Sequence, residues 1–317
     1  MKRPLSLMVC LTCISGIVIA QPSLGGRAGA PMRFGFGAAA LGMGNSVASL
    51  AGRDAVALYN PALAPFQTTP AILAGSALMS LDRSLLFVSY GTHLPPSAGI
   101  SFTIVRAGVS SIVGRDRNGV PTQSYSVAEN AFGLSFGLRP APDLSIGVTA
   151  RLLYAQMIEE LTSTTVGLDL GASYLVQEGL RGSIVLRDVN AKYKWDTKSL
   201  YGQNANSTID KFPTRFIVAL GWTPAETQSA ISIEAEAVAG GWLYRTGAEI
   251  SLHEMLVVRA GVDGIDPTET LGSRWSAGLS VVHTGLPWNP TFDYAFMSEP
   301  YSPSPVHVIT LRLYVKE

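Results

Sequence analysis

The chain has 317 residues, which is enough for one large barrel or two ordinary domains. Its 23 lysines and arginines balance 23 aspartates and glutamates, so no excess of positive charge points to a nucleic acid partner. Mean hydropathy is +0.26 with 15% charged residues. Beyond residue 20, however, no apolar run reaches the roughly 20 residues of a spanning helix, which excludes a bundle of such helices.

Residues 1–20 are predicted to be a cleaved secretory signal peptide. Lys2 and Arg3 precede an apolar stretch that ends in a small-residue cleavage site. The alternative, an uncleaved anchor helix, is disfavoured because the stretch is short and no stop-transfer pattern follows. Cys10 and Cys13 both lie in this segment, so disulfide and thiolate chemistry are not expected in the mature chain. Its removal leaves 21 basic against 23 acidic residues, a net charge of −2.

Residues 21–67 are rich in glycine and alanine. The run Ala-Ala-Ala-Leu-Gly-Met-Gly at 38–44 and the block Tyr-Asn-Pro-Ala-Leu at 59–63 predict short helical turns and loops rather than strands. Small side chains allow close packing of the backbone, so this segment suits a confined space.

Residues 68–317 are predicted to form long strands in which apolar and small or polar side chains alternate. In residues 165–174 the apolar positions are Val166, Leu168, Leu170, Ala172 and Tyr174. Successive side chains of a strand point to opposite faces, so one face is apolar and the other accepts a carboxylate. A soluble β-sandwich would bury the apolar face, whereas a transmembrane barrel would show it to lipid.

The lengths of the connections favour the barrel. Fourteen strands are expected, an even number as in bacterial barrels, starting near residues 69, 84, 98, 126, 144, 164, 180, 214, 229, 242, 255, 273, 291 and 306. Odd-numbered connections such as 108–124 and 190–213 are mostly long, and even-numbered ones such as 139–143 and 177–179 are mostly tight. This sorting is typical of an antiparallel outer-membrane barrel with short periplasmic turns.

Four charged residues are expected to face the lumen. Arg151, Asp169, Glu234 and Glu236 occupy the polar face of their strands. Each would cost several kcal/mol in a dry core unless paired, so a wet or plugged lumen is the more economical environment. Aromatic residues near several strand ends suit the girdles at the membrane surfaces.

The sequence resembles the PorV/PorQ family of outer-membrane barrels, which is related to the FadL superfamily of long-chain fatty-acid transporters. The resemblance rests on residues 41–54, on the 59–63 block, on Phe-Asp-Tyr-Ala-Phe at 292–296 and on Lys-Trp-Asp-Thr at 194–197. It implies a fourteen-stranded barrel whose N-terminal segment, ending in an Asn-Pro-Ala turn, enters the lumen as a hatch. The residues expected to shape this hatch are Gly42, Gly44, Asp54, Asn60, Pro61 and Ala62.

Two functions follow from this resemblance. The first is a role in type IX protein secretion, in which external loops bind secretion-system proteins or the C-terminal signal domains of cargo. Lys194, Trp195 and Tyr201 in the 190–213 connection are the candidate partner residues. The alternative is a FadL-like transporter of a hydrophobic small molecule, although the charged lumen residues argue mildly against a purely apolar conduit. In both cases outer-membrane lipid surrounds the barrel.

No motif for catalysis, a cofactor or a metal is found. Gly35-Phe36-Gly37 opens a dinucleotide-like spacing but lacks the βαβ context that such a site needs. The four histidines stand far apart, and no nucleophile motif occurs. Glu234 and Glu236 share a face and resemble a catalytic carboxylate pair, but lining of the lumen explains them better. A non-enzyme is therefore expected.

Overall fold

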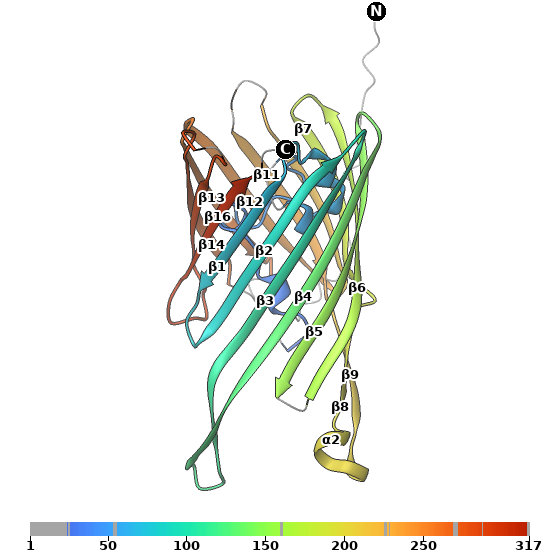
Figure 1. The fold of residues 1–317 in the computed structure, drawn as a ribbon, viewed down its shortest axis with the longest axis vertical. Coiled ribbons are helices and arrows are strands. Elements are labelled where there is room, and N and C mark those ends of the chain that lie inside the picture. Colours follow the sequence, from blue (N-terminus) through green and yellow to red (C-terminus); the bar gives the residue numbers. More distant parts are fainter. Residues whose placement is uncertain are drawn as a thin grey trace, which may run out of the picture.

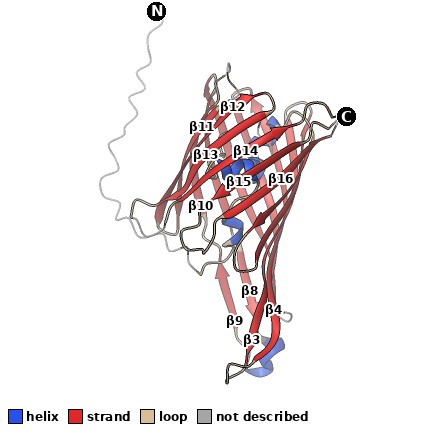
Figure 2. Cartoon of the chain, turned by 90° about the vertical axis from the view of Figure 1, so that its left-hand side faces the viewer, coloured by secondary structure: helices blue, strands red, loops and turns tan. Residues whose placement is uncertain are grey.

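The computed structural model describes residues 24, 26–52, 56–158, 161–224, 227, 229–268, 272–286 and 288–315. Fourteen strands form one closed antiparallel barrel, and two further strands form a separate hairpin (Figures 1 and 2). The predicted all-β fold with about fourteen strands is confirmed. Within the described part of the chain, no helix has the length and hydropathy to cross a membrane.

The strands of the barrel begin within a few residues of the predicted positions, except for an earlier start of β4. They are β1 (Ala71–Leu78), β2 (Arg83–Leu94), β3 (Ala98–Arg115), β4 (Pro121–Ala141), β5 (Leu144–Ile158), β6 (Leu161–Gln177), β7 (Leu180–Val189), β10 (Arg215–Trp222), β11 (Ala230–Val238), β12 (Gly241–His253), β13 (Leu256–Ile265), β14 (Arg274–Val282), β15 (Thr291–Met297) and β16 (Val306–Tyr314). β1 pairs with β16 and closes the ring, so the barrel has no free edge along this seam.

Along the strands that form the wall of the barrel, outward apolar side chains alternate with inward small or polar ones, as the sequence pattern predicts. On β6, Leu170 is 46% exposed on the outside, whereas its neighbour Asp169 is only 2% exposed on the inside. Apolar side chains such as Phe132, Val218 and Ile233 are exposed around the outside of the barrel. This apolar outer surface, on a sheet closed on itself, is the pattern of a membrane-spanning barrel and the reverse of a soluble sandwich.

The two ends of the barrel differ. One end, the short-turn end, carries tight turns such as those after β4 and β6 and lies beside the C-terminus (Figure 1). At the other, the long-loop end, β3 and β4 project beyond their neighbours, and so does a hairpin of β8 (Lys192–Asp196) and β9 (Ser207–Lys211). A short helix α2 (Lys198–Tyr201) and a 3₁₀ turn η4 (Gly202–Asn204) form the tip of this hairpin.

The β8–β9 hairpin lies within the long connection predicted at 190–213, where no strands were predicted. Its strands are only five residues long, too short for alternation to stand out. Tyr193 explains why they form, because it is 2% exposed and packs edge-on against Phe212 at 4.9 Å between ring centroids. Burial of these aromatic rings stabilises a hairpin that would be marginal by itself.

Residues 26–52 and 56–66, the inner segment, run through the barrel (Figure 1). The segment contains η1 (Pro31–Arg33), α1 (Ala38–Gly42), η2 (Val56–Leu58) and η3 (Pro61–Phe66). Glycines on the inner face of the wall admit its backbone. A Cβ atom at Gly261 would lie 2.3 Å from the backbone N of Gly44, and one at Gly99 would lie 2.2 Å from the carbonyl O of Ala64.

Candidate functional site

One half of the lumen is apolar and tightly packed. It is lined by inward side chains of β1 to β5, β15 and β16, such as Phe87, Val105 and Leu153. Met32, Phe34 and Phe36 of the inner segment pack into the same cluster and are 2%, 9% and 5% exposed. The inner segment and this side of the wall therefore form a closed apolar core rather than a water-filled channel.

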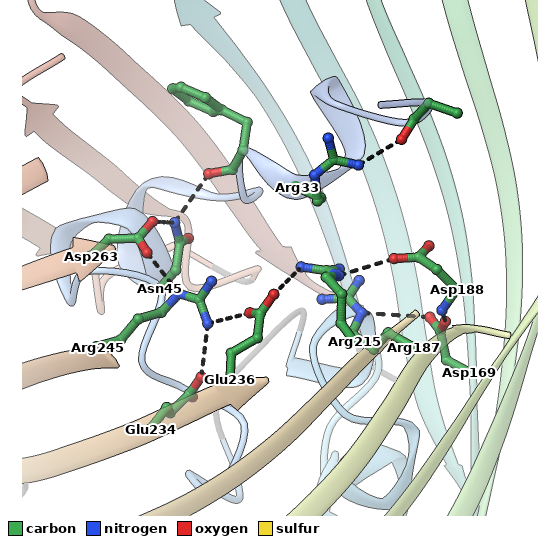
Figure 3. Close-up of polar contacts among 12 residues, drawn as sticks. Arg33, Asn45, Asp169, Arg187, Asp188, Arg215, Glu234, Glu236, Arg245 and Asp263 are labelled. Atoms are coloured by element: carbon green, nitrogen blue, oxygen red, sulfur yellow. Dashed lines mark hydrogen bonds and ion pairs between the residues drawn. The ribbon is translucent and has the colours of Figure 1, made fainter. Parts of the chain in front are cut away.

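The other half of the lumen holds a continuous set of ion pairs, the charged arc, which runs from β5 to β14. Its members are Arg151, Asp169, Arg187, Asp188, Arg215, Glu234, Glu236, Arg245, Asp263 and Arg274. Each of these ten residues has a partner of opposite sign within the arc, which is what burial of charge requires. Figure 3 shows most of this arc.

The first part of the arc joins β5, β6, β7 and β10. Arg151 Nη2 lies 2.6 Å from Asp169 Oδ1 and 2.6 Å from Asp188 Oδ1. Asp188 Oδ2 in turn lies 3.0 Å from Arg215 Nε. Arg187 lies beside them with a single, longer ion pair, 3.7 Å from its Nε to Asp169 Oδ2. Because Asp188 has a φ of 59°, two consecutive residues, Arg187 and Asp188, are both buried in the lumen.

The second part of the arc joins β11, β12, β13 and β14. Arg245 is its centre, with Nη1 2.6 Å from Glu236 Oε2 and Nε 2.7 Å from Asp263 Oδ1. Its contact with Glu234 is weaker, at 3.9 Å. Arg274 Nη2 closes the arc at 2.6 Å from Asp263 Oδ2. Charge-assisted contacts of this length are the strong ones, so the arc fixes the positions of these strands relative to one another.

The inner segment is anchored on the charged arc through hydrogen bonds. The backbone N–H of Ala48 donates to Glu234 Oε1 at 2.7 Å, and Asn45 Nδ2 donates to Asp263 Oδ2 at 2.8 Å. The Tyr59 hydroxyl lies 2.8 Å from Asn45 Oδ1 and accepts the N–H of Phe36 at 2.8 Å. Burial raises the pKa of Tyr59, so its hydroxyl keeps its proton. The segment is thus apolar toward one half of the lumen and polar toward the other.

A cavity of about 490 Å³ lies at the short-turn end, above α1. Phe36, Met43 and Val257 are among its apolar lining residues. Its charged residues include Arg259, whose Nε lies 2.5 Å from Glu249 Oε2. In the same lining, Arg312 Nη2 lies 3.4 Å from Asp293 Oδ2. The size and mixed lining are those of a small-molecule site.

The four charged residues predicted to face the lumen all lie in the charged arc. Arg151 and Asp169 form a direct ion pair, and so belong to one cluster, while Glu234 and Glu236 both contact Arg245. Sequence reasoning missed the arginines that complete the arc on β7, β10 and β12. The inward parity of β12, where Leu243 and Arg245 share a face, was a signal that pointed to one of them.

The residues predicted for the hatch lie at contacts between the inner segment and the wall. A Cβ atom at Gly42 would lie 3.1 Å from Gly278 Cα, and one at Gly44 would lie 2.6 Å from the backbone N of Val262. Asn60 caps η3 by accepting the N–H of Ala62 at 3.0 Å and donates to the carbonyl of Ala48 at 2.8 Å. Pro61 and Ala62 are buried at the start of η3, and Asp54 lies outside the described residues. Their structural role in shaping a hatch stays a prediction, as does the signal peptide, which also lies outside the described residues.

The three candidate partner residues lie on the hairpin at the long-loop end. Lys194 is exposed on β8, and Trp195 is half-buried against Tyr193 with ring centroids 5.4 Å apart. Tyr201 at the tip is 64% exposed. Lys194 and Trp195 are consecutive on β8 and so point to opposite faces, and the role of all three in partner binding stays a prediction. Among the described residues, no group of three histidine, cysteine, aspartate or glutamate side chains is arranged to hold a metal ion.

Comparison with solved structures finds several proteins with a similar fold. The toluene transporter TbuX of Ralstonia pickettii superposes with a TM-score of 0.60 at 12% identity, over 89% of this chain and 99% of its own. The toluene transporter TodX of Pseudomonas putida gives 0.59 at 13% identity, over 88% and 97%. A FadL homologue of Pseudomonas aeruginosa gives 0.60 at 11% identity, over 87% and 97%. These identities establish the shared fold alone.

Neither protein-family models nor curated proteins match the sequence. The PorV/PorQ assignment and the secretion role therefore have no support from these comparisons, and the structural neighbours agree better with the transport alternative. What the molecule defines is a class of fold: a closed fourteen-stranded antiparallel barrel with an apolar outer surface and a segment of its own chain inside the lumen.

Proposed function

We propose that this barrel carries hydrophobic small molecules across the outer membrane. The observation that carries the proposal is the 490 Å³ cavity, whose apolar lining is shared by the wall and the inner segment. A porin would need a continuous polar channel, whereas here the apolar packing of Met32, Phe34 and Phe36 closes the lumen. A ligand in this cavity would touch the inner segment directly, so binding and opening can be coupled.

The charged residues of the cavity bear on the kind of ligand. Arg259 is paired with Glu249, and Arg312 with Asp293, so each arginine has a carboxylate beside it. A ligand carboxylate would have to compete with these partners. The proposal is therefore that neutral, apolar compounds are carried in preference to fatty acids.

Filling the cavity is expected to reduce transport. Val257 lines the cavity from β13, whereas its neighbour Val258 points to the opposite face of the same strand. V257W should lower the uptake of radiolabelled toluene several-fold in cells that lack their own FadL-type transporters, and V258W should not. Uptake of labelled oleate, measured in parallel, tests the preference for a neutral ligand.

Equal uptake by cells with and without the protein would reject the transport proposal. Affinity purification from native outer membranes, followed by mass spectrometry of proteins and lipids, gives the complementary result. A bound apolar compound would support transport, whereas recovery of secretion-translocon proteins or exported cargo would favour the secretion role instead.

A further inference from the structure

Two buried arginines face each other across neighbouring strands of the charged arc. Arg187 on β7 and Arg215 on β10 are directly opposite in the strand register. They are 6% and 3% exposed. Like charges in this arrangement repel each other, and burial removes the water that would screen them. Burial of this arginine pair therefore requires that each guanidinium has a negatively charged group close to it.

The carboxylates of the arc meet this requirement only in part. Arg215 uses Nε for Asp188 and Nη1 for Glu236, at 3.0 and 3.6 Å, while its buried Nη2 has no hydrogen-bond partner among the described residues. The only contact of Arg187 with a described charged group is the 3.7 Å ion pair with Asp169. Since a guanidinium carries five N–H donors, most of the donors of Arg187 are unused within the described part of the protein.

A third guanidinium approaches from the inner segment. Arg33 of η1 donates to the backbone carbonyls of Ala28 and Arg27, at 2.6 and 3.4 Å, and forms no ion pair with a described residue. Repulsion from Arg215 is among the causes that lower the pKa of Arg33, after burial itself. Figure 3 shows Arg33 on the inner segment and Arg187 and Arg215 on the wall of the barrel.

These three arginines all line one small cavity of about 20 Å³. Its charged lining consists of Arg33, Arg187, Arg215 and Arg245 against Glu234 and Glu236. Glu234 accepts the N–H of Ala48, and Glu236 lies 2.6 Å from Arg245 and 3.6 Å from Arg215, so the arginines outnumber the carboxylates around the cavity. The volume holds one water-sized species and is too small for sulfate or for the chain of an organic acid.

We propose that this cavity binds one small monovalent inorganic anion, of the chloride class, held by Arg33, Arg187 and Arg215. The anion would accept the unused N–H groups of Arg187 and the free Nη2 of Arg215. Because Arg33 belongs to the inner segment and the other two to the wall, the bound anion ties the segment to the barrel. Halide therefore stabilises the closed form, whatever the protein transports.

The test compares halide with gluconate, an anion too large for the cavity, at constant ionic strength. The full-length protein is purified in detergent without chloride, and its thermal unfolding is followed by tryptophan fluorescence during a titration with sodium bromide. The expected result is a saturable rise of the melting midpoint. Crystals grown in bromide should show an anomalous peak between the three guanidinium groups.

Two variants and a control link the effect to the site. R187Q should abolish both the shift and the peak. R187K, which keeps the charge but offers fewer donors in another geometry, should raise the half-saturating bromide concentration by about tenfold. R106Q, at an exposed arginine on the outer face of β3, should respond like the unaltered protein. Since the halide response is measured on the unaltered protein, a variant that fails to fold does not weaken the test.

Three results would overturn the proposal. One is an equal midpoint in bromide and gluconate, and another is the absence of an anomalous peak in the cavity. The third is a peak without a saturable shift, which would mean an adventitious ion only.

Discussion

The change Arg245→Met is expected to lower the free energy of unfolding by about 3–5 kcal/mol, the usual cost of removing one partner of a buried ion pair. Arg245 contacts Glu236, Asp263 and, more weakly, Glu234, so its loss leaves three buried carboxylates short of a cation. Methionine has a similar length and no charge, so the effect reports on charge rather than on lost volume. Unfolding in urea, followed by fluorescence in lipid or detergent, measures it.

Arg106→Met is the matched control for this change. Arg106 is exposed on the outer face of β3, and its hydrogen bond within the described part of the chain goes to Asn130, so the same substitution should cost at most about 1 kcal/mol. If R245M is no more destabilising than R106M, water reaches the arc freely and the lumen is wet rather than sealed. In that case the anchoring of the inner segment on the arc would also be weaker than the geometry implies.

The double change G247A/G261A is expected to displace the inner segment and open the barrel to polar solutes. A Cβ atom at Gly247 would lie 2.2 Å from the carbonyl O of Met43, and one at Gly261 would lie 2.3 Å from the N of Gly44. Both clashes are with backbone, which cannot yield by a change of rotamer. Because neither glycine has a positive φ, the strands themselves accept alanine. Ion conductance in planar bilayers should rise from a closed to an open level.

The control uses two glycines of the barrel wall at which a Cβ atom would not clash. A Cβ atom at Gly133 would lie 3.6 Å from its nearest neighbour, Arg151 Cγ, and one at Gly182 would lie 3.9 Å from Val176 Cγ2. G133A/G182A should therefore keep the low conductance of the unaltered protein. Equal conductance of the two double variants would show that the inner segment does not close the barrel.

The barrel itself was predictable because the information that specifies it is local. The alternation in residues 165–174 follows from the pleat of a single strand, and it assigned Leu170 to the outside and Asp169 to the inside correctly. The connections indicated the number of strands, since turns such as 139–143 and 177–179 separate strands that are consecutive in the chain and neighbours in the barrel. No distant contact is needed for either inference, which is why the number of strands was correct.

The partners of the lumen charges depend on contacts that no local pattern contains. Asn45 meets Asp263 across 218 residues, and Ala48 meets Glu234 across 186, because the inner segment passes through a ring that closes elsewhere. Alternation also fails at Asp188, where a positive φ turns two consecutive charges into the lumen. The sequence by itself therefore determined which face of each strand is polar, through the two-residue period of the backbone. Only the closed tertiary structure decided which charges pair, where the inner segment is held and where the cavities lie, because these depend on the curvature and register of all fourteen strands together.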